Sequence, residues 1–350
     1  MSATSDLSPS RATPGWPIIG HEGAVRTLAR AIESGQVHHA YLLAGPAGIG
    51  RTTLAFVLAQ ALLCEAAAEQ RPCGMCRSCQ RIARRVHPDV TRIGLDTGAE
   101  EAKQVSIDQV RELRASLSLR PLEGAWRIAI VDDAERLSRE AADALLKTLE
   151  EPPPYAVLVL VAEDPQALPE TIRSRCQTIV LQPLPIPVVA RALEARGAAP
   201  ELANRLARET RGRIALAFRL VTDEAARVQR EKRVAEVIAA MTEPLAAIGF
   251  ARRLAEQYRR GRRAEVLSSL QLALELWRDA LWLAADPSAP IVHEDARPTL
   301  ERFARRCGIA GASAGLSATL QALADLESNV QARLALDAAM VTWAEVSRCA

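Results

Sequence analysis

The chain has 350 residues and a formal net charge of +2, and 49% of its residues are hydrophobic while only 3% are aromatic. This length predicts two or three domains, whose cores must be rich in Leu, Ala and Val. The small net charge excludes a chain that is drawn to nucleic acid or acidic membranes by its overall charge. No apolar run approaches the roughly 20 residues that a membrane-spanning helix needs, so we expect no membrane partner.

The amino-terminal residues 1–15 are polar and contain prolines without an apolar core. We predict a flexible arm here and not a secretory signal. The chain also contains seven cysteines. Without a secretory signal they indicate a reducing compartment, where clustered cysteines bind metal more often than they form disulfides. We therefore predict a cytoplasmic location.

A predicted helix over 24–34 is followed by a short apolar run over 41–44, which predicts a buried strand. A glycine-rich loop comes next, and Thr52 or Thr53 then begins a second helix. The loop consists of Gly45, Pro46, Ala47, Gly48, Ile49 and Gly50. Its glycines allow backbone N–H groups to surround an anion, and the helix N-terminus adds its dipole. This order of elements predicts a nucleotide phosphate site, the alternative being a chance turn.

The loop departs from the phosphate-binding pattern at Arg51, where the pattern has a lysine. Lysine carries a compact charge on a flexible stem, whereas arginine is a broad planar fork, so the two are not equivalent beside a β- or γ-phosphate. The sequence therefore predicts the frame of a site for ATP or ADP with Mg²⁺. It leaves open whether that site hydrolyses nucleotide.

Four cysteines fall close together after the second helix, at Cys64, Cys73, Cys76 and Cys79. Thiolates separated by two residues can share one tetrahedral ion, and four of them close its coordination shell, as in structural zinc sites. We predict a structural zinc ion here, and the alternative is a loop of free thiols. His87 is the nearest competing ligand, and we expect it to take no part.

The next predicted elements are a helix over 105–117, a strand over 127–133, a helix over 138–150, and strands over 157–161 and 178–181. This alternation predicts an α/β domain, a parallel sheet with helices on both faces. The strand over 127–133 ends in Asp132 and Asp133, and we expect Asp132 beside the phosphate loop, where it can hold Mg²⁺. Asp133 stands where a glutamate would polarise the attacking water, and it is one methylene shorter. The alternative is a pair of solvated acids.

The segment 171–176 precedes the last predicted strand and contains Arg175. An arginine at this place is either a surface charge at a helix end or a finger that reaches the γ-phosphate of a neighbouring subunit. The second role needs a permanent planar cation, which arginine supplies. The spacing alone favours neither interpretation.

The composition changes at the proline-rich stretch 182–187, after which we predict no strand. We predict a small helical domain over 183–243 and a larger all-α domain over 244–350. The helices expected in the larger domain run over 245–260, 264–285 and 317–346. Its leucine stripe predicts a core or a subunit interface anchored by Trp277, Trp282 and Trp343. The paired arginines of this domain indicate solvated helix faces more than surfaces on which bases stack, because no aromatic residues lie between them.

With these residues in place, the sequence resembles the AAA+ clamp-loader subunits of bacterial DNA polymerase III. The motifs that carry the resemblance are, in order, residues 38–53, the four-cysteine insert, 144–153, 171–176 and 329–337. The resemblance covers essentially everything after the amino-terminal arm. It implies an α/β P-loop (AAA+) domain over 16–182 with a zinc-binding insert over 64–79, a helical lid domain over 183–243, and a helical collar domain over 244–350.

The resemblance also implies partners and site residues. The partners are other clamp-loader subunits, of motor and delta type, in a ring of five, and the complex acts on the sliding clamp and primed DNA. The nucleotide would lie on residues 45–53 with Asp132 and with Arg213, which resembles the lid arginine of the family. The four cysteines would hold structural Zn²⁺, and Arg175 would act in trans on the ATP of an adjacent motor.

Three departures from the motor pattern stand out within this resemblance. They are Arg51, Asp133 and Glu163, the last of which replaces a small hydroxyl residue that senses the γ-phosphate. A carboxylate ~4 Å from a phosphate charge costs about 4 kcal/mol at an effective dielectric constant near 20. Together the departures favour a delta-prime type stator with weak or absent ATPase activity. The alternatives are a gamma/tau-type motor subunit and an independent P-loop phosphotransferase.

Overall fold

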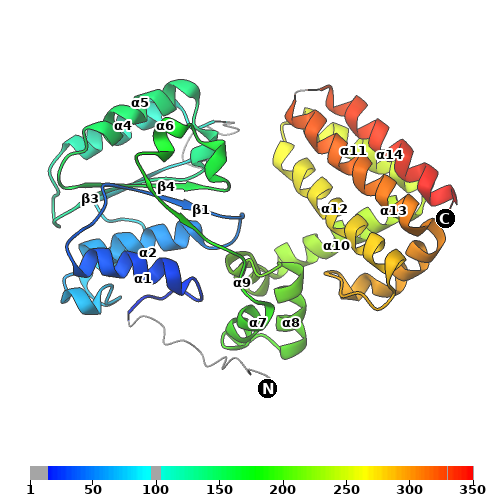
Figure 1. The fold of residues 1–350 in the computed structure, drawn as a ribbon, viewed down its shortest axis with the longest axis horizontal. Helices are drawn as coiled ribbons and strands as arrows, with labels where there is room; N and C mark the ends of the chain where they lie inside the picture. Colours follow the sequence, from blue (N-terminus) through cyan, green and yellow to red (C-terminus); the bar gives the residue numbers. More distant parts are fainter. Residues whose placement is uncertain (1–14, 96–103, 329, 350) are drawn as a thin grey trace, which may run out of the picture. The chain divides into compact units, whose positions relative to one another are not determined.

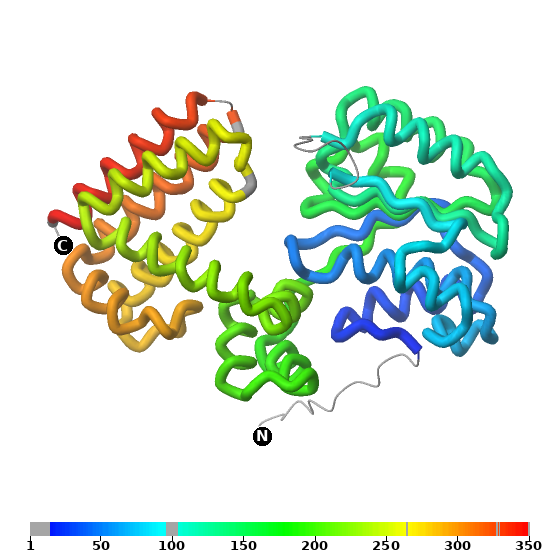
Figure 2. Tube along the Cα trace, turned by 180° about the vertical axis from the view of Figure 1, so that it is seen from behind, coloured from blue at the N-terminus to red at the C-terminus, as the bar shows by residue number. Residues whose placement is uncertain are grey.

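The computed structural model describes residues 15–95, 104–328 and 330–349. The predicted flexible arm, apart from Gly15, lies outside the described residues. The chain divides into two compact units. The first comprises residues up to Arg196 together with Gly212–Ala217, and the second comprises Gly197–Arg211 and the residues from Phe218 onwards. Figures 1 and 2 show that the first unit contains the sheet and that the second is helical.

The first unit is built on a five-stranded parallel sheet with the strand order β2-β3-β4-β1-β5. The strands are β1 (Ala40–Ala44), β2 (Val90–Ile93), β3 (Arg127–Val131), β4 (Ala156–Ala162) and β5 (Gln177–Val180). All residues of β1, β3 and β4 are buried, as is usual for parallel strands with helices on both faces. The predicted α/β fold is confirmed. The register pairs Ala44 with both Ala162 and Val180, so neighbouring strands end at one edge of the sheet.

Helices of the first unit cover both faces of this sheet. The helices of this unit are α1 (Glu22–Glu33), α2 (Arg51–Leu63), α3 (Arg77–Ala83), α4 (Ile107–Ser118), α5 (Arg139–Glu150), α6 (Glu170–Arg173) and α7 (Ile186–Glu194), with the 3-10 turns η1 (Ala68–Gln70), η3 (Ala134–Arg136) and η4 (Pro165–Ala167), and α7 lies away from the sheet (Figure 1). Figure 1 shows α1 and α2 on one face and α4 and α5 on the other. Because strand side chains alternate in direction, Leu43 packs in the core with α2 and Leu42 packs in the core with α4 and α5.

The second unit is a helical bundle. Its helices are α8 (Pro200–Glu209), the second half of α9 (Ile214–Thr222), α10 (Glu224–Thr242), α11 (Pro244–Arg259), α12 (Arg263–Ala285), α13 (Arg297–Glu327) and α14 (Ala332–Cys349), with the turn η5 (Glu294–Ala296). The rings of Trp277 and Trp343 meet edge-on in its core, with centroids 5.5 Å apart. A Cβ atom at Gly315 would lie 2.5 Å from the Trp277 ring, so only glycine allows this approach. Two of the three expected tryptophan anchors are buried, whereas Trp282 is 48% exposed.

Two expectations about elements were wrong. Strand β2 was not predicted, because it lies at the edge of the sheet and three of its four residues are only half-buried. The single helix expected over 317–346 is two helices, since α13 begins at Arg297, departs from helical geometry at Gly308 and ends at Glu327 before α14 begins. The apolar period of the sequence continues through this break and so concealed it.

One helical segment of the described residues, Glu294–Leu326, is long and apolar enough to pass the length and composition test for a membrane span. Helices in the core of a soluble protein pass the same test. This segment packs against α12 and α14. Its buried residues include the large side chains of Leu300, Phe303 and Leu326 as well as the small residues Ala312, Gly315 and Thr319.

Candidate functional site

The glycine-rich loop lies at the carboxyl edge of the sheet, directly after β1. The backbone N–H of Gly45 donates to the carbonyl oxygens of Ala162 (3.3 Å) and Glu163 (3.2 Å), which fixes the loop to the end of β4. Gly45, Gly48 and Gly50 have φ angles of 144°, 77° and 109°, a region that side chains with a Cβ rarely adopt. The loop therefore has the backbone form that the phosphate-binding pattern requires, and α2 begins directly after it.

A short segment of the first unit, residues 212–217, packs against this loop. The backbone N–H of Leu216 donates to the carbonyl oxygen of Gly48 over 3.1 Å. A Cβ atom at Gly48 would lie 2.8 Å from the Cβ atom of Leu216, so the close approach depends on glycine. Arg213, which was predicted to contact nucleotide, belongs to this segment, three residues before Leu216. The segment thus lies beside the phosphate loop.

Arg51 begins α2 and directs its guanidinium towards acidic residues. Its Nη2 atom lies 3.9 Å from Oε1 of Glu163, and its side chain is only 12% exposed. Glu135, in the turn after β3, interacts electrostatically with both. Burial raises the pKa of Glu135, and the negative charge of Glu163 adds to this effect while the positive charge of Arg51 opposes it. Sequence reasoning missed Glu135, because a glutamate two residues after Asp133 matches no motif position that we considered.

Asp132 lies at the end of β3 and is held by two side chains. The hydroxyl of Thr52 donates to its carboxylate, with Oγ1 at 3.2 Å from both oxygen atoms. The guanidinium of Arg92, from β2, donates to Oδ2 through Nη2 (2.9 Å) and Nε (3.3 Å). Thr52 and Asp132, both predicted site residues, are therefore brought together. Arg92 was missed, because strand β2 was missed.

Asp133 is directed towards a different partner. Its φ angle is 52°, in the left-handed region, and its Oδ2 atom accepts a hydrogen bond from the backbone N–H of Leu95 over 3.4 Å. This contact ties the carboxylate to the chain that follows β2. The residue that would polarise an attacking water is thus engaged in a structural hydrogen bond, in addition to being shorter than the glutamate of the motif.

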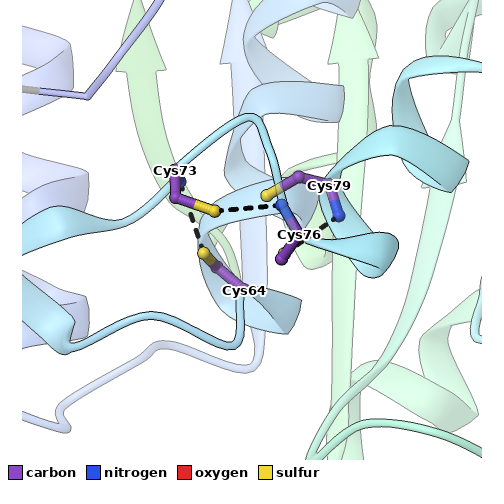
Figure 3. A group of neighbouring side chains, drawn as sticks. All are labelled: Cys64, Cys73, Cys76 and Cys79. Carbon is purple, nitrogen blue, oxygen red and sulfur yellow. Dashed lines mark hydrogen bonds between the residues drawn. The ribbon is translucent and has the colours of Figure 1, made fainter.

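The four cysteines of the insert converge on one point, as Figure 3 shows. Their sulfur atoms all lie within 4.8 Å of one another, and Cys64 and Cys79 are buried. A tetrahedral ion with Zn–S bonds of about 2.3 Å places its sulfur ligands about 3.8 Å apart. The four sulfurs of Cys64, Cys73, Cys76 and Cys79 therefore fit a zinc ion in spacing and in chemistry. His87 stands apart from this group, with Nε2 3.9 Å from the carboxylate of Glu123.

Backbone N–H groups prepare the cysteine cluster for a cation. The N–H of Cys73 points at the sulfur of Cys64, and that of Cys76 at the sulfur of Cys73, both over 3.3 Å. The N–H groups of Cys76 and Met75 lower the pKa of the Cys73 thiol to about 6. Burial raises the pKa of Cys79 and of Cys64. A metal ion inside the cluster would supply the positive charge that these two buried thiolates need.

Arg175 follows α6 and lies at the surface of the first unit. Its Nη2 atom donates to Oε1 of Glu150 over 3.0 Å, and its Nη1 atom donates to the carbonyl oxygen of Thr171 over 2.9 Å. The side chain is 37% exposed and that of Glu150 is 51% exposed. An exposed pair of this kind is worth about 0.2–1 kcal/mol. The contact therefore orients the guanidinium and leaves it accessible to a neighbouring molecule.

Comparison with known proteins identifies relatives of the first unit. Residues 20–185 match the family model described as "DNA polymerase III, delta subunit". The DNA polymerase III subunit tau of Escherichia coli is 35% identical over 177 residues, which are 51% of this chain and 27% of that protein. The gamma subunit of Buchnera aphidicola subsp. Acyrthosiphon pisum is 36% identical over 165 residues, which are 47% of this chain and 44% of that protein.

A third relative shows a similar level of identity. The DNA polymerase III subunit gamma/tau of Mycobacterium tuberculosis (strain H37Rv) is 35% identical over 179 residues, which are 51% of this chain and 30% of that protein. The chain spans less than half the length of each of these relatives. The matched residues contain the phosphate loop, the cysteine cluster and Arg175. Residues 20–185 of this chain are therefore similar to the DNA polymerase III delta-subunit family model and to tau and gamma subunits of DNA polymerase III.

Proposed function

We propose that this chain is the delta-prime subunit of a DNA polymerase III clamp loader. In this role it is a stator in a ring of five subunits that loads the sliding clamp on primed DNA. It contributes a trans arginine finger, Arg175, to the ATP of a neighbouring motor subunit. Its own nucleotide pocket keeps the frame of a P-loop site but hydrolyses ATP weakly or not at all.

The charge distribution around the phosphate loop is the observation that carries this proposal. Arg51 faces Glu163 at 3.9 Å, so its charge is shared with a carboxylate that a bound triphosphate would also meet. Two negative charges ~4 Å apart cost about 4 kcal/mol at an effective dielectric constant near 20. Asp133, whose place in the motif belongs to the residue that polarises water, accepts the N–H of Leu95 instead. Each of these features weakens hydrolysis, and they act in one pocket.

The accessible guanidinium of Arg175 supports the second half of the proposal. An arginine finger must be charged at all pH values and must reach a γ-phosphate that belongs to another subunit. Arg175 is 37% exposed and is held by surface contacts to Glu150, Thr171 and Ser174. The zinc ion that the cysteine cluster fits would be structural, because four sulfur ligands close its shell and leave no position for a substrate.

A motor subunit of the gamma/tau type is the second candidate. Its support is specific, since the three relatives named above are all tau or gamma subunits. If the chain is a motor subunit, the pocket around Arg51 must bind and hydrolyse ATP. An independent phosphotransferase is a weaker alternative, because it gives no role to the cysteine cluster or to the helical second unit.

The test is reconstitution of the full chain with motor and delta-type subunits, followed by measurement of the ATPase rate stimulated by clamp and primed DNA. An arginine finger contributes roughly 10³–10⁵ to the rate of hydrolysis at its site. We expect Arg175→Ala to remove the share of the total rate that comes from the adjacent motor. Arg175→Lys should not restore it, because lysine lacks the planar fork.

The matched control is Arg111→Ala. Arg111 is also an exposed arginine of the first unit, and its Nη1 atom pairs with Asp108 at 3.2 Å, much as Arg175 pairs with Glu150. The control variant should leave the rate of the ring unchanged. A ring whose ATPase rate is the same with Arg175→Ala as with the unaltered chain, while assembly is intact, would remove the finger role.

A further inference from the structure

The two side chains that a bound magnesium ion would use in this pocket are already engaged with each other and with a cation of the protein. Thr52 donates its hydroxyl hydrogen towards the carboxylate of Asp132, with Oγ1 3.2 Å from both oxygens. The guanidinium of Arg92 lies on the same carboxylate, with Nη2 2.9 Å from Oδ2. Arg92 on strand β2 therefore places a positive charge directly against the carboxylate of Asp132.

The residues present do not fit a magnesium ion. Mg²⁺ demands near-ideal octahedral geometry with ligand oxygens at about 2.0–2.1 Å. Hydroxyl and carboxylate are suitable ligand types, but Oδ2 of Asp132 already accepts two N–H groups of Arg92, and the hydroxyl of Thr52 lies 3.2 Å from both carboxylate oxygens. A divalent cation at this place would lie next to a guanidinium that cannot lose its proton. The carboxylate of Asp132 thus has its charge and its hydrogen bonds balanced by Arg92 and Thr52 of the same chain.

The position of Arg92 is built into the sheet. Arg92 pairs in register with Ile130 of β3, two residues before Asp132, so the side chains of Arg92 and Asp132 lie on the same face of the sheet. The Arg92 side chain is 19% exposed and that of Asp132 is 12% exposed. Arg92 also lines a cavity of about 240 Å³ together with Phe56, Val90 and Arg85. The guanidinium is therefore held beside Asp132 by a largely buried stem.

We infer that Arg92 takes the place of the divalent cation at Asp132, so that any nucleotide held by the phosphate loop binds independently of Mg²⁺. This inference rests on the proposed function, because it explains how the pocket keeps its P-loop frame without a catalytic metal. It also goes beyond it, since it assigns the exclusion of magnesium to one residue outside the motifs.

The test compares the affinity of the full, zinc-loaded chain for ADP in buffer with Mg²⁺ and in buffer freed of divalent cations by resin, because a soluble chelator would strip the zinc. All variants carry Arg51→Lys and Glu163→Thr, which return the motif lysine and remove the repelling carboxylate. With Arg92 present, the two affinities should agree within about twofold. In the Arg92→Ala variant, the affinity for ADP with Mg²⁺ should exceed the affinity without Mg²⁺ at least about tenfold.

Two controls separate this effect from general disturbance. Arg85→Ala removes the other arginine of the same cavity, which stacks on Phe56 at 4.6 Å, and should leave the ratio of the two affinities near one. Adding Asp132→Asn to Arg92→Ala should abolish the magnesium dependence. Arg92→Gln keeps a hydrogen-bond donor without the charge. It provides a second variant if Arg92→Ala loses its zinc or if its circular dichroism spectrum differs from that of the folded chain.

The inference is overturned if ADP binds at least tenfold tighter with Mg²⁺ while Arg92 is present. It is equally overturned if the folded Arg92→Ala or Arg92→Gln variant shows no magnesium dependence or binds no ADP at all. Either result would leave the trans finger intact, because that role is measured on the assembled ring through Arg175. Conversely, an unchanged ATPase rate of the ring with Arg175→Ala would not affect the measured magnesium dependence of ADP binding in the Arg92 variants.

Discussion

Asp89 offers the sharpest test of how the sheet that positions the site is stabilised. This residue precedes β2 and is fully buried. Its carboxylate accepts the N–H groups of Leu122 (2.7 Å) and Glu123 (2.8 Å) and pairs with Nη1 of Arg127 at 3.1 Å. Arg127 begins β3, the strand directly before Asp132. Substitution Asp89→Ala removes the partner of a buried guanidinium and should therefore loosen the β2–β3 pair.

The expected magnitude follows from burial. Arg127 is only 7% exposed, so Asp89→Ala leaves an uncompensated buried charge, which costs about 3–5 kcal/mol. The N–H groups released at residues 122, 123 and 124 add less, because these residues are exposed and can turn to water. A typical domain is stable by about 5–15 kcal/mol, so the first unit should lose a third or more of its stability.

The assay must read the first unit alone, because a chain with two compact units need not unfold in one step. Hydrogen exchange of peptides from β2 and β3 in increasing urea meets this need. The control is Asp108→Ala, which removes an exposed partner of Arg111 and should cost no more than about 1 kcal/mol. The double variant Asp89→Ala/Arg127→Met should recover much of the loss. Equal stability of Asp89→Ala and Asp108→Ala would refute the reasoning.

Three further predictions concern acid, the cysteine cluster and the phosphate loop. Burial alone would raise the pKa of Asp89, but the backbone N–H groups around it hold that pKa below its usual range. Asp89 thus stabilises the fold above its unfolded pKa of about 3.9 and loses this contribution as the pH falls through the folded pKa, so acid should destabilise Asp89→Ala less than the unaltered chain. Metal analysis should find one zinc ion per chain, and Cys76→Ser should lose both the zinc and the fold of the insert. A metal-free chain whose insert is natively folded would contradict the zinc site. Gly48→Ala should destabilise the first unit more than Gly35→Ala, because both have positive φ but only Gly48 approaches Leu216, and equal losses in thermal denaturation would contradict this contact.

The parts of the site that could be predicted from the sequence are contiguous motifs. The phosphate loop, the end of β3 and the cysteine cluster each lie in one short stretch whose spacing sets its own geometry. Asp132 could be placed beside the loop because parallel strands end at one edge of the sheet. In the structure, the hydroxyl of Thr52 lies 3.2 Å from the carboxylate of Asp132.

The parts that could not be predicted depend on contacts between distant segments. Arg92 comes from a four-residue edge strand whose mixed burial gives no strong periodic signal. The break between α13 and α14 lies inside a continuous apolar period. Residue Glu135 acquires its role only because the turn after β3 brings it towards Arg51 and Glu163. Arg92 and Glu135 lie far in the sequence from the residues they contact, so no local pattern could reveal these contacts.

The central claim is that the phosphate loop of this chain has the wrong neighbours for hydrolysis, so that its useful charge is Arg175 and not its own pocket. Steady-state ATP turnover by the purified, isolated full chain in Mg²⁺ tests it most directly. The claim predicts a rate indistinguishable from that of the same preparation carrying Asp132→Asn. Turnover at the rate of an isolated motor subunit, abolished by Asp132→Asn, would contradict the claim and establish the gamma/tau-type alternative.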